Sequence, residues 1–521
     1  MSLQDKTQRP AEPATAWLAN FPGSLRNYQG FLQSSSNRLF AKNGNSEGAR
    51  NGLIFSAMKH FMRFTALLLA GFAAANAFSQ PKLDATNGVS ATADYPEIVK
   101  ASILRDYPGM LHSPTGALAH AFITPGSVYA SQIWDWDAWL SDVALCQIVA
   151  DLGRSSDKQK MLSYGEGCVL NFLEAARPDG SIPIQLQVKA RSAPPPDTAQ
   201  DGERANIHKP VLAQHAAFLV KLNHGDAEWL RGKFQVLQAF QKYYREQQYH
   251  AATGLYFWRD DFAIGVDTDP ATFFRPRNSS GSIYLNCLMY KELRAMAYLA
   301  RCLQLDKAVG DQYDRQADDL KAAVQKNCWD ERDGYFYSVD LNLVPFTGKP
   351  GHYFGRELVL HAGHPRDYDC LIQRIEGWSG FLAMWSGIAT PEQAKRMVEE
   401  HLKNPKTLGA PYGIRSLSKM EKMYGIYASN NPSDWMGPIW GISNYMVFQG
   451  LRKYGFTAEA KDMADKTIAL FGRDVVKSGT LHEYYDPDSG EPVMNKGFQN
   501  WNYLVMNMLA WEEGRPVVEE F

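Results

Sequence analysis

Cysteine is rare in this sequence and forms no motif. Six cysteines are scattered over 521 residues, without a CxxC pair and without a close group of cysteine and histidine. That spacing disfavours a zinc site, and a chain of this length does not need a disulfide scaffold. Isolated pairs could still form in an oxidising compartment. We therefore expect no metal site and no cofactor.

A surplus of charge of one sign is also missing. The formal net charge is −2, charged residues make up 21% of the chain, and no long basic run occurs. This balance disfavours nucleic acid or an anionic membrane as a partner. Aromatic residues are abundant instead, with 13 tryptophans and 25 tyrosines. A large core buries most such side chains, but the remainder suits an uncharged, hydroxyl-rich ligand, so we expect a small-molecule carbohydrate as partner.

Apolar runs long enough to cross a bilayer comfortably are absent, and the one run that stands out is short. It lies in MKHFMRFTALLLAGFAAANAFSQ, which starts at Met58. Basic residues come first, the apolar run 64–75 follows, and Ala-Asn-Ala at 75–77 fits a signal-peptidase site. The segment is typical of a secretory signal peptide rather than a membrane span. A chance apolar stretch in a cytoplasmic protein is the alternative.

The expected signal peptide, residues 58–77, lies far from the start of the chain. Residues 1–57 are polar, include a stretch rich in glycine and serine, and show no sustained apolar period. We interpret them as a non-native or disordered extension, with Met58 or Met62 as the true start. Cleavage would leave a periplasmic or secreted protein that begins near Phe78 and has no membrane contact.

Strand-like patches are few and short, and helical patterns dominate from about Tyr95 onward. Apolar residues recur at three- and four-residue spacing in a series of segments. These segments are 136–151, 158–176, 210–222, 229–247, 282–305, 313–327, 391–402, 440–454, 458–471 and 499–513. About twelve helices in paired succession fit an all-α fold, the (α/α)6 toroid, with the site in loops at one mouth of a central funnel. We expect this catalytic domain at 95–521, after a linker at 78–94.

Aromatic and acidic residues concentrate in loops rather than along the helices. Residues 134–139 read WDWDAW, which places rings that favour burial beside carboxylates that do not. Similar loops occur at 179–187, 258–282, 410–419, 430–445 and 481–503. One interpretation is a core surface that touches solvent. The other is a pocket in which rings stack on a ligand and carboxylates bind its hydroxyls.

Two carboxyls stand apart from the ordinary turn residues of these loops. Asp267 lies in IGVDTDP and Glu483 lies in TLHEYY, each with apolar or aromatic neighbours. A carboxyl in apolar surroundings has a raised pKa, because burial disfavours its charged form. A general acid that works at neutral pH requires such a pKa. A helix cap or an ion-paired side chain is the alternative for each residue.

Four stretches of the sequence resemble glycoside hydrolase family 63, which belongs to the six-hairpin glycosidase superfamily. They are GVDTDPATFFRPRNSSGSIYLN, PYGIRSLS, PIWGISNYMVFQGL and LHEYYDPDSGEP…GFQNWN. The similarity runs from about Asp135 to Trp511, and the mannosylglycerate hydrolase-like branch is the nearest. The resemblance implies an (α/α)6 barrel and hydrolysis of α-glycosides with inversion. It also implies that Asp267 is the general acid and Glu483 the general base.

Two positions depart from the pattern of this family. Met436 stands where many relatives have an arginine, and Thr268 stands where asparagine is common. These departures affect the identity of the substrate more than the reaction. The resemblance therefore implies an α-glucosidase or a mannosylglycerate hydrolase-like enzyme and leaves the sugar and its linkage open.

Further residues are expected to bind the sugar. Trp134 or Trp136 would supply a flat platform. Asp135 or Asp137 would accept hydrogen bonds from hydroxyls, and the sequence does not say which member of each pair faces the pocket. Other candidates for the pocket wall, each of which could equally pack or form a surface pair, are Gln185, Arg275, Arg415, Trp435 and Trp440.

Two other functions fit the same sequence features. A polysaccharide lyase or an epimerase could use the same toroid, with tyrosine, histidine or arginine as its base and no pair of carboxylates. A non-catalytic sugar-binding protein would keep the tryptophans and would not need Asp267. Products from a panel of α-glycosides distinguish these alternatives from a hydrolase.

Overall fold

The structure is a computed structural model that describes residues 94–521, except 154, 190–204, 344–349, 360–366 and 427–432. The expected extension at 1–57, the expected signal peptide at 58–77 and all but the last residue of the expected linker lie outside the described residues. The described part belongs to one compact unit, Ala91–Phe521. Within that part, no helix combines the length and the apolar character that a membrane span needs.

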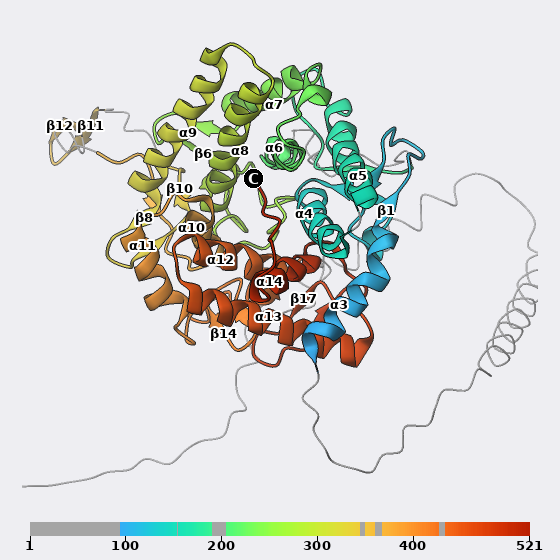
Figure 1. Ribbon diagram of the computed structural model, residues 1–521. Helices are drawn as coiled ribbons and strands as arrows, with labels where there is room; N and C mark the ends of the chain where they lie inside the picture. The colour runs from blue at the N-terminus through green and yellow to red at the C-terminus, as the bar shows by residue number, and fades with distance from the viewer. Residues whose placement is uncertain (1–93, 154, 190–204, 344–349, 360–366, 427–432) are drawn as a thin grey trace, which may run out of the picture. The chain divides into compact units, whose positions relative to one another are not determined.

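Six α-helices form an inner ring, which Figure 1 shows nearly end-on. Each packs against the next, and the last returns to the first, so the ring closes. These inner helices are α4 (Asp135–Leu152), α6 (Leu212–Leu222), α8 (Ile283–Cys302), α10 (Leu382–Ser386), α12 (Gly441–Lys453) and α14 (Val505–Glu512).

The outer helices alternate with the inner ones along the chain and surround them (Figure 1). They are α3 (Tyr95–Asp106), α5 (Ser155–Glu174), α7 (Phe234–Gln247), α9 (Lys307–Cys328), α11 (Pro391–Arg396) and α13 (Thr457–Ser478). A π-helical turn, Met397–Leu402, extends α11. This alternation of inner and outer helices is the expected (α/α)6 arrangement.

The sequence patterns of the two rings differ because their burial differs. In α4 every side chain from Asp135 to Val149 is buried, as expected for a helix that neighbours surround on all sides. In the outer helix α9, buried residues such as Tyr313, Ala317 and Leu320 follow one stripe, and polar residues occupy the remaining faces. The amphipathic pattern therefore identifies the outer helices better than the inner ones.

Several helix boundaries differ from those expected. Helix α7 begins at Phe234 rather than at 229, because Glu228–Leu230 form a separate 3-10 turn. Helix α9 begins at Lys307, before the expected 313, and α13 continues past 471 to Ser478. The segment expected as a helix from 499 starts as the 3-10 helix Asn500–Leu504, and α14 follows it. Helices α3 and α10 were not expected at all.

Short antiparallel strands connect the helices. One set comprises β1 (Leu111–His112) with β2 (Phe122–Ile123), β3 (Gln132–Trp134) with β4 (Gln185–Gln187), β5 (Tyr249–His250) with β6 (Leu255–Tyr256), and β8 (Trp329–Asp330) with β9 (Tyr335–Phe336). Others are β11 (Pro350–Tyr353) with β12 (Arg356–Val359), and β14 (Gly409–Ala410) with β15 (Gly413–Ile414). Three-stranded sheets join β10 (Val339–Asp340) to β7 (Ser280–Gly281) and β13 (Leu371–Ile372), and β17 (Tyr484–Tyr485) to β16 (Ile439–Trp440) and β18 (Pro492–Met494).

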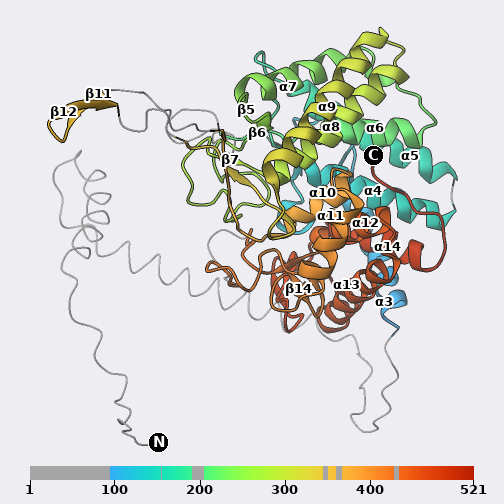
Figure 2. The same ribbon diagram turned by 90° about the vertical axis from the view of Figure 1, so that its left-hand side faces the viewer.

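The two ends of the helical ring have different roles. In Figure 2 long loops and short strands gather at one end, whereas the C-terminal residues lie at the other. At that second end, the buried carboxylate of Glu520 accepts hydrogen bonds from Trp385 Nε1 of α10 (2.7 Å) and from the Tyr445 hydroxyl of α12 (2.8 Å). The C-terminal segment therefore links neighbouring inner helices.

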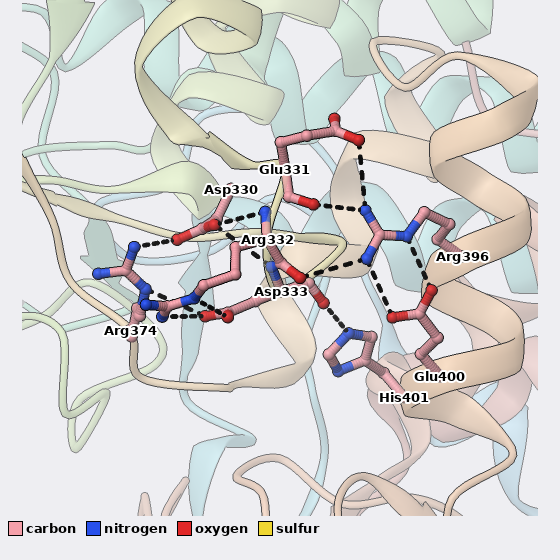
Figure 3. Close-up of polar contacts among 8 residues, drawn as sticks. All are labelled: Asp330, Glu331, Arg332, Asp333, Arg374, Arg396, Glu400 and His401. Atoms are coloured by element: carbon pink, nitrogen blue, oxygen red, sulfur yellow. Dashed lines mark hydrogen bonds and ion pairs between the residues drawn. The ribbon is translucent and has the colours of Figure 1, made fainter.

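The turn between β8 and β9 shows how a loop is fastened to an outer helix (Figure 3). Arg396, the last residue of α11, donates to the Glu331 carbonyl oxygen (2.6 Å) and binds Glu400 through Nε (2.7 Å). Gly334 has φ +68°, and a Cβ there would lie 2.6 Å from the Arg396 guanidinium carbon. Only glycine combines this backbone with this close approach, so we interpret the cluster as structural.

Candidate active site

The segment WDWDAW joins β3 to α4 and places its two aspartates in different surroundings. Asp135 binds the Lys209 ammonium at 2.8 Å and also accepts a hydrogen bond from the Lys209 backbone N–H at 2.8 Å. Both side chains are at most 1% exposed. A buried charge persists only when it is paired and hydrogen-bonded, so the oxygens of Asp135 already serve the fold.

Asp137, two residues later, forms no ion pair with any residue that the structure describes. Its carboxyl accepts a hydrogen bond from the side-chain amide of Asn500. Burial, reinforced by the charge of Asp135, raises the pKa of Asp137 to about 7, and Lys209 and Asn500 oppose that rise. Of the two aspartates, Asp137 is therefore the one whose carboxyl remains available to a ligand or to a proton.

Four tryptophans from distant segments pack together beneath these carboxyls. Trp435 and Trp440 stack with ring centroids 4.1 Å apart, and Trp136 lies 6.3 Å from Trp435 and 5.2 Å from Trp501. All four are at most 4% exposed. We call them the tryptophan cluster. Because these rings cover one another, Trp134, which is only half-buried, is the more accessible member of the pair Trp134 and Trp136.

Asp267 lies in the loop between β6 and β7. Its Oδ1 accepts a hydrogen bond from the backbone N–H of Gly265 (3.1 Å), and Ser433 also hydrogen-bonds its carboxyl. Burial raises the pKa of Asp267 to about 6, against the opposing charge of Lys209. Gly265 has φ +84°, and a Cβ there would lie 2.8 Å from Lys209 Cε. The glycine thus lets this loop pack directly on the buried lysine.

The loop that carries Asp267 is attached to the tryptophan cluster. Thr268 accepts a hydrogen bond from the Trp435 backbone N–H at 2.6 Å. The Trp440 indole donates to the Asp434 carbonyl oxygen at 2.8 Å. Thr268, which departs from the family pattern, therefore has a structural partner in this chain.

Glu483 lies just before β17. The next residue, Tyr484, begins β17 and pairs with Trp440 of β16. Its carboxyl accepts hydrogen bonds from the Asn495 amide and from the Tyr129 hydroxyl, the latter at 3.4 Å to each oxygen. Burial raises the pKa of Glu483 to about 8, and the hydrogen bond from Asn495 opposes that rise. Glu483 is 4% exposed.

The charges of Asp137 and Asp267 act on Glu483 although the three residues come from separate parts of the chain. The charges of Asp137 and Asp267 both raise the pKa of Glu483. Neighbouring carboxyls do not all ionise together, so they share protons and titrate as a group. Such a group holds a proton donor beside a proton acceptor near neutral pH, which is what acid–base hydrolysis requires.

The remaining expected wall residues make other contacts. Gln185 pairs with Trp134 across β3 and β4 and donates to Gln132, which keeps it beside the site. Arg275 forms an ion pair with Asp340. The structure therefore gives Arg275 a partner within the protein, and its role toward a ligand stays a prediction.

Arg415 is buried beneath the loop at 405–409. Its guanidinium donates to the Gly409 carbonyl oxygen and binds Asp488 at 2.7 Å. These contacts fasten the β14–β15 hairpin to the turn after β17. The contacts of Arg415 are those of a structural residue, and a contact with sugar stays a prediction.

Sequence reasoning missed Tyr129, Lys209, Asn495 and Asn500. Each is a single polar residue whose neighbours in sequence show no special pattern. Asn495 and Asn500 lie in the segment NKGFQNWN, where they read as ordinary loop residues. A search for donors in the segment that follows Glu483 could have found Asn495, because a short hairpin returns the chain to its starting point.

Groups of metal-ligating side chains and the cysteines can be compared with the expectations from the sequence. No three His, Cys, Asp or Glu side chains there are placed to hold a metal ion. All six cysteines are described and all are free thiols, four of them buried. The pairing left open from the sequence does not occur in this structure.

Comparisons with known proteins agree with this fold. Residues 130–502 match the family model described as the mannosylglycerate hydrolase MGH1-like glycoside hydrolase domain. The mannosylglycerate hydrolase of Thermus thermophilus is 25% identical over 442 residues, which cover 73% of this chain and 95% of that protein. A probable trehalase of Eremothecium gossypii is 30% identical over 221 residues, 40% of this chain.

The first two curated relatives are covered only in part. The aligned residues span 26% of that trehalase and 24% of a mannosylglycerate hydrolase of Selaginella moellendorffii. Two solved structures extend the comparison. The crystal structure of a GH63 mannosylglycerate hydrolase from Thermus thermophilus, in complex with glucose, has a TM-score of 0.54 at 19% identity and covers 79% of this chain and 99% of its own. The neutral trehalase of Saccharomyces cerevisiae has a TM-score of 0.52 at 16% identity over 75% of this chain and 73% of its own. These likenesses confirm the expected toroid.

Proposed function

The chain belongs to the mannosylglycerate hydrolase MGH1-like glycoside hydrolase family, and from that premise we propose that it is an inverting glycosidase that cleaves α-glycosidic bonds of a small sugar, glycoside or oligosaccharide. One observation carries the proposal. Asp267 and Glu483 are more than two hundred positions apart in sequence, yet the charge of Asp267 raises the pKa of Glu483 within a largely buried site. An inverting hydrolase needs two such carboxyls on opposite sides of the scissile bond.

In the proposed mechanism Asp267 protonates the glycosidic oxygen, and Glu483 takes a proton from the attacking water. The carboxyls of an inverting pair stand roughly 6.5–9.5 Å apart, which leaves room for that water. Burial supports both roles, because charges and dipoles act more strongly where water is excluded. Asp137 and Trp134 would hold the sugar through its hydroxyls and one ring face.

The order of the two pKa values bears on these roles. The pKa of Glu483 is raised to about 8 and that of Asp267 to about 6. Glu483 therefore binds a shared proton more tightly than Asp267 does. The proposed roles require the form in which Asp267 holds the proton. A glycosidic oxygen bound beside Asp267 and a water bound beside Glu483 would favour this form. The opposite assignment exchanges acid and base and keeps the reaction the same.

The substrate class is proposed from charge as well as from family. Among the described residues, Lys209 is the cation whose charge lowers the pKa values of Asp137 and Asp267, and its ammonium is bound to Asp135. A neutral sugar meets no repulsion in such a site, whereas an anionic one needs a cation from elsewhere. We therefore favour a neutral α-glucoside over mannosylglycerate as the substrate.

The test is a panel of α-glycosides with the anomer of the product read by NMR. The panel contains mannosylglycerate, glucosylglycerate, trehalose, kojibiose, nigerose and maltose. We expect hydrolysis of at least one member, with inversion of the anomeric carbon. Retention would contradict the mechanism, an eliminated product would indicate a lyase, and binding without turnover would indicate a sugar-binding protein.

We also propose that the protein is exported. The support is the short apolar run that precedes Ala-Asn-Ala at 75–77. Expression from Met58 should give a soluble protein whose N-terminus lies near Phe78. N-terminal sequencing that finds an uncleaved chain in the exported fraction, or no export at all, would contradict this.

A further inference from the structure

The segment Asn495–Asn500 touches two carboxyls of the site through its first and last residues. The Asn495 amide donates to Glu483, and the Asn500 amide donates to Asp137. We call this segment the asparagine loop. Both asparagines have φ +44°, in the left-handed region. Asparagine adopts that backbone more readily than most residues with a side chain, so the residue type suits the two points where the loop meets the carboxyls.

The asparagine loop is anchored on both sides. The backbone N–H groups of Gly497 and Phe498 both donate to the Leu481 carbonyl oxygen, at 2.8 and 3.2 Å. Gly126 forms a β-bridge with Phe498. The Phe498 ring meets the Tyr129 ring edge to face, with centroids 6.1 Å apart. These contacts fix the loop against the segment at 125–129, which delivers Tyr129 to the same carboxylate.

Asn495, Tyr129 and Glu483 form a closed set of hydrogen bonds. The Asn495 amide nitrogen donates to Glu483 and, at 3.3 Å, to the Tyr129 oxygen. The Tyr129 hydroxyl then has its own proton left for Glu483. Its pKa is raised by burial and by the charge of Glu483, so it keeps that proton. Both neighbours thus donate, and hydrogen bonds donated to a carboxyl stabilise its ionised form more than its protonated form.

We propose that Asn495 is a positioning residue for Glu483: its left-handed backbone aims the amide so that it orients Glu483 and stabilises the ionised form that accepts the proton of the attacking water. This proposal rests on the proposed function. It differs from packing, because a packing residue has no preference for one protonation state of its neighbour.

Other groups also change the pKa of Glu483, in addition to Asn495. Asp137 of α4 and Asp267 of the β6–β7 loop raise its pKa through their charges, as burial does. Tyr484, the next residue, is itself raised in pKa and stays neutral. The two donors, Asn495 and Tyr129, oppose these effects. Loss of Asn495 should therefore raise the pKa of Glu483 further.

The test replaces Asn495 with glycine. Asn495→Gly removes the amide but keeps a residue that adopts positive φ without strain, so the fold should survive. Glu483 has the higher pKa of the pair, so its ionisation sets the basic limb of the pH profile, whereas the active form has Glu483 ionised and Asp267 protonated. We expect the basic limb of Asn495→Gly to move upward by about one pH unit, the size of effect that one hydrogen bond to a charged group produces. Between the two limbs kcat/KM should fall about tenfold, because less Glu483 is ionised while Asp267 still holds its proton.

A matched control and a second variant separate positioning from packing. Gln304 is exposed at the end of α8 and also has a left-handed backbone, with φ +54°. Gln304→Gly makes the same backbone change away from the carboxyls and should leave the basic limb in place. Tyr129→Phe removes the second donor and should move the limb in the same direction as Asn495→Gly.

Two outcomes would overturn the proposal. One is a uniform loss of activity with an unmoved basic limb in Asn495→Gly, accompanied by a lower thermal midpoint. The other is no change in either quantity. A measurement without substrate keeps the proposal independent of the function: NMR titration of 13C-carboxyl glutamate, with the Glu483 signal assigned by its absence in Glu483→Gln. If no glycoside is hydrolysed the proposed function fails, and an unshifted Glu483 titration in Asn495→Gly overturns this inference separately.

Discussion

At the scale of single residues, neighbouring side chains of the same type have different chemistry. Asp135 and Asp137 stand in the first turn of one helix, yet Asp135 is bound to a buried ammonium, whereas Asp137 has only an amide partner. A carboxylate at a helix N-terminus is favoured in either case. The partner, and not the position, decides which of them can hold a proton near neutral pH.

The roles of Asp267 and Glu483 can be assigned by changing the leaving group. Asp267→Asn and Glu483→Gln should each lose at least about 10²-fold in kcat, the usual lower bound for an acid or base. Asp267→Asn should recover much of its rate on a glycosyl fluoride, because fluoride departs with little need of a proton. Glu483→Gln should not recover, because the water still needs a base.

Three results would change this picture. Recovery by Glu483→Gln alone would exchange the two roles. Near-full turnover of both variants on the natural substrate would contradict a carboxyl mechanism. Recovery of both would mean that neither residue is the base.

The pH profile of the unaltered protein follows from the same pair. Below pH about 6 both carboxyls are protonated and no base is left, and above pH about 8 both are ionised and no acid is left. We expect kcat/KM to follow a bell with limbs near these values, which belong to the pair rather than to either residue. Initial rates at low substrate concentration from pH 4.5 to about 9.5 measure the profile. A rate that stays constant from pH 5 to about 9 would contradict it.

At the scale of elements, α6 depends on a cap from another helix. Its own N-cap residue, Val211, has no side-chain cap. Glu292 of α8 supplies one, accepting the backbone N–H groups of Ala213 (2.8 Å) and Gln214 (3.0 Å) within the core. We expect Glu292→Ala to lower the free energy of unfolding by about 2–4 kcal/mol, because two buried donors lose their acceptor.

Urea unfolding at pH 8 measures this loss, because the pKa of Glu292 is raised to about 7 by burial and the carboxylate is then ionised. The control is Glu246→Ala, which removes an exposed glutamate of α7 and should change stability by less than about 0.5 kcal/mol. Equal midpoints for the two variants would show that the cap contributes nothing.

The sequence predicts those parts of the fold that depend on residues close together in the chain. The paired helices of the toroid follow from apolar spacing. The sequence pattern predicts that α13 ends at 471, before Gly472, which is too early. In the structure Gly472 lies inside the helix, and a Cβ there would lie 2.5 Å from Tyr95 of α3. Gly472 permits α3 to cross α13 closely, and α3 was not among the expected helices. The early end expected for α13 and the absence of α3 from the expected helices therefore have the same cause, a contact between distant parts of the chain.

The site was only partly accessible to sequence reasoning for a similar reason. Asp267 and Glu483 could be predicted because their neighbours in the sequence are apolar or aromatic. Asn495 and Tyr129 matter only through the residue they bind, which lies elsewhere in the chain. Buried Arg415 looked like a wall residue, because a sequence does not show which carbonyl oxygens an arginine meets.

At the scale of the whole molecule, the cysteines report on the integrity of the two rings. Cys146, Cys168, Cys287 and Cys328 are buried, in α4, α5, α8 and α9, and the other two are half-buried. We expect a small thiol reagent to modify at most Cys302 and Cys370 quickly in the folded protein. The buried thiols should react only as fast as the rings open.

Mass spectrometry over time measures this reaction, and full denaturation gives the reference of six modified thiols. Burial raises the pKa of Cys287 to about 12, which further slows its reaction in the folded state. Rapid modification of more than two thiols in the native protein would show that the inner ring is looser than the structure indicates.

The closure of the inner ring by α14 against α4 has a consequence for biosynthesis. Helix α4 leaves the ribosome some 350 residues before α14 does. During that interval the growing polypeptide can form only an open arc, whose apolar inner edges face water with no partner. Long-range contacts of this kind fold slowly and expose surfaces that aggregate. The nascent chain should therefore need a chaperone until α13 and α14 have been synthesised and packed, however stable the complete ring is.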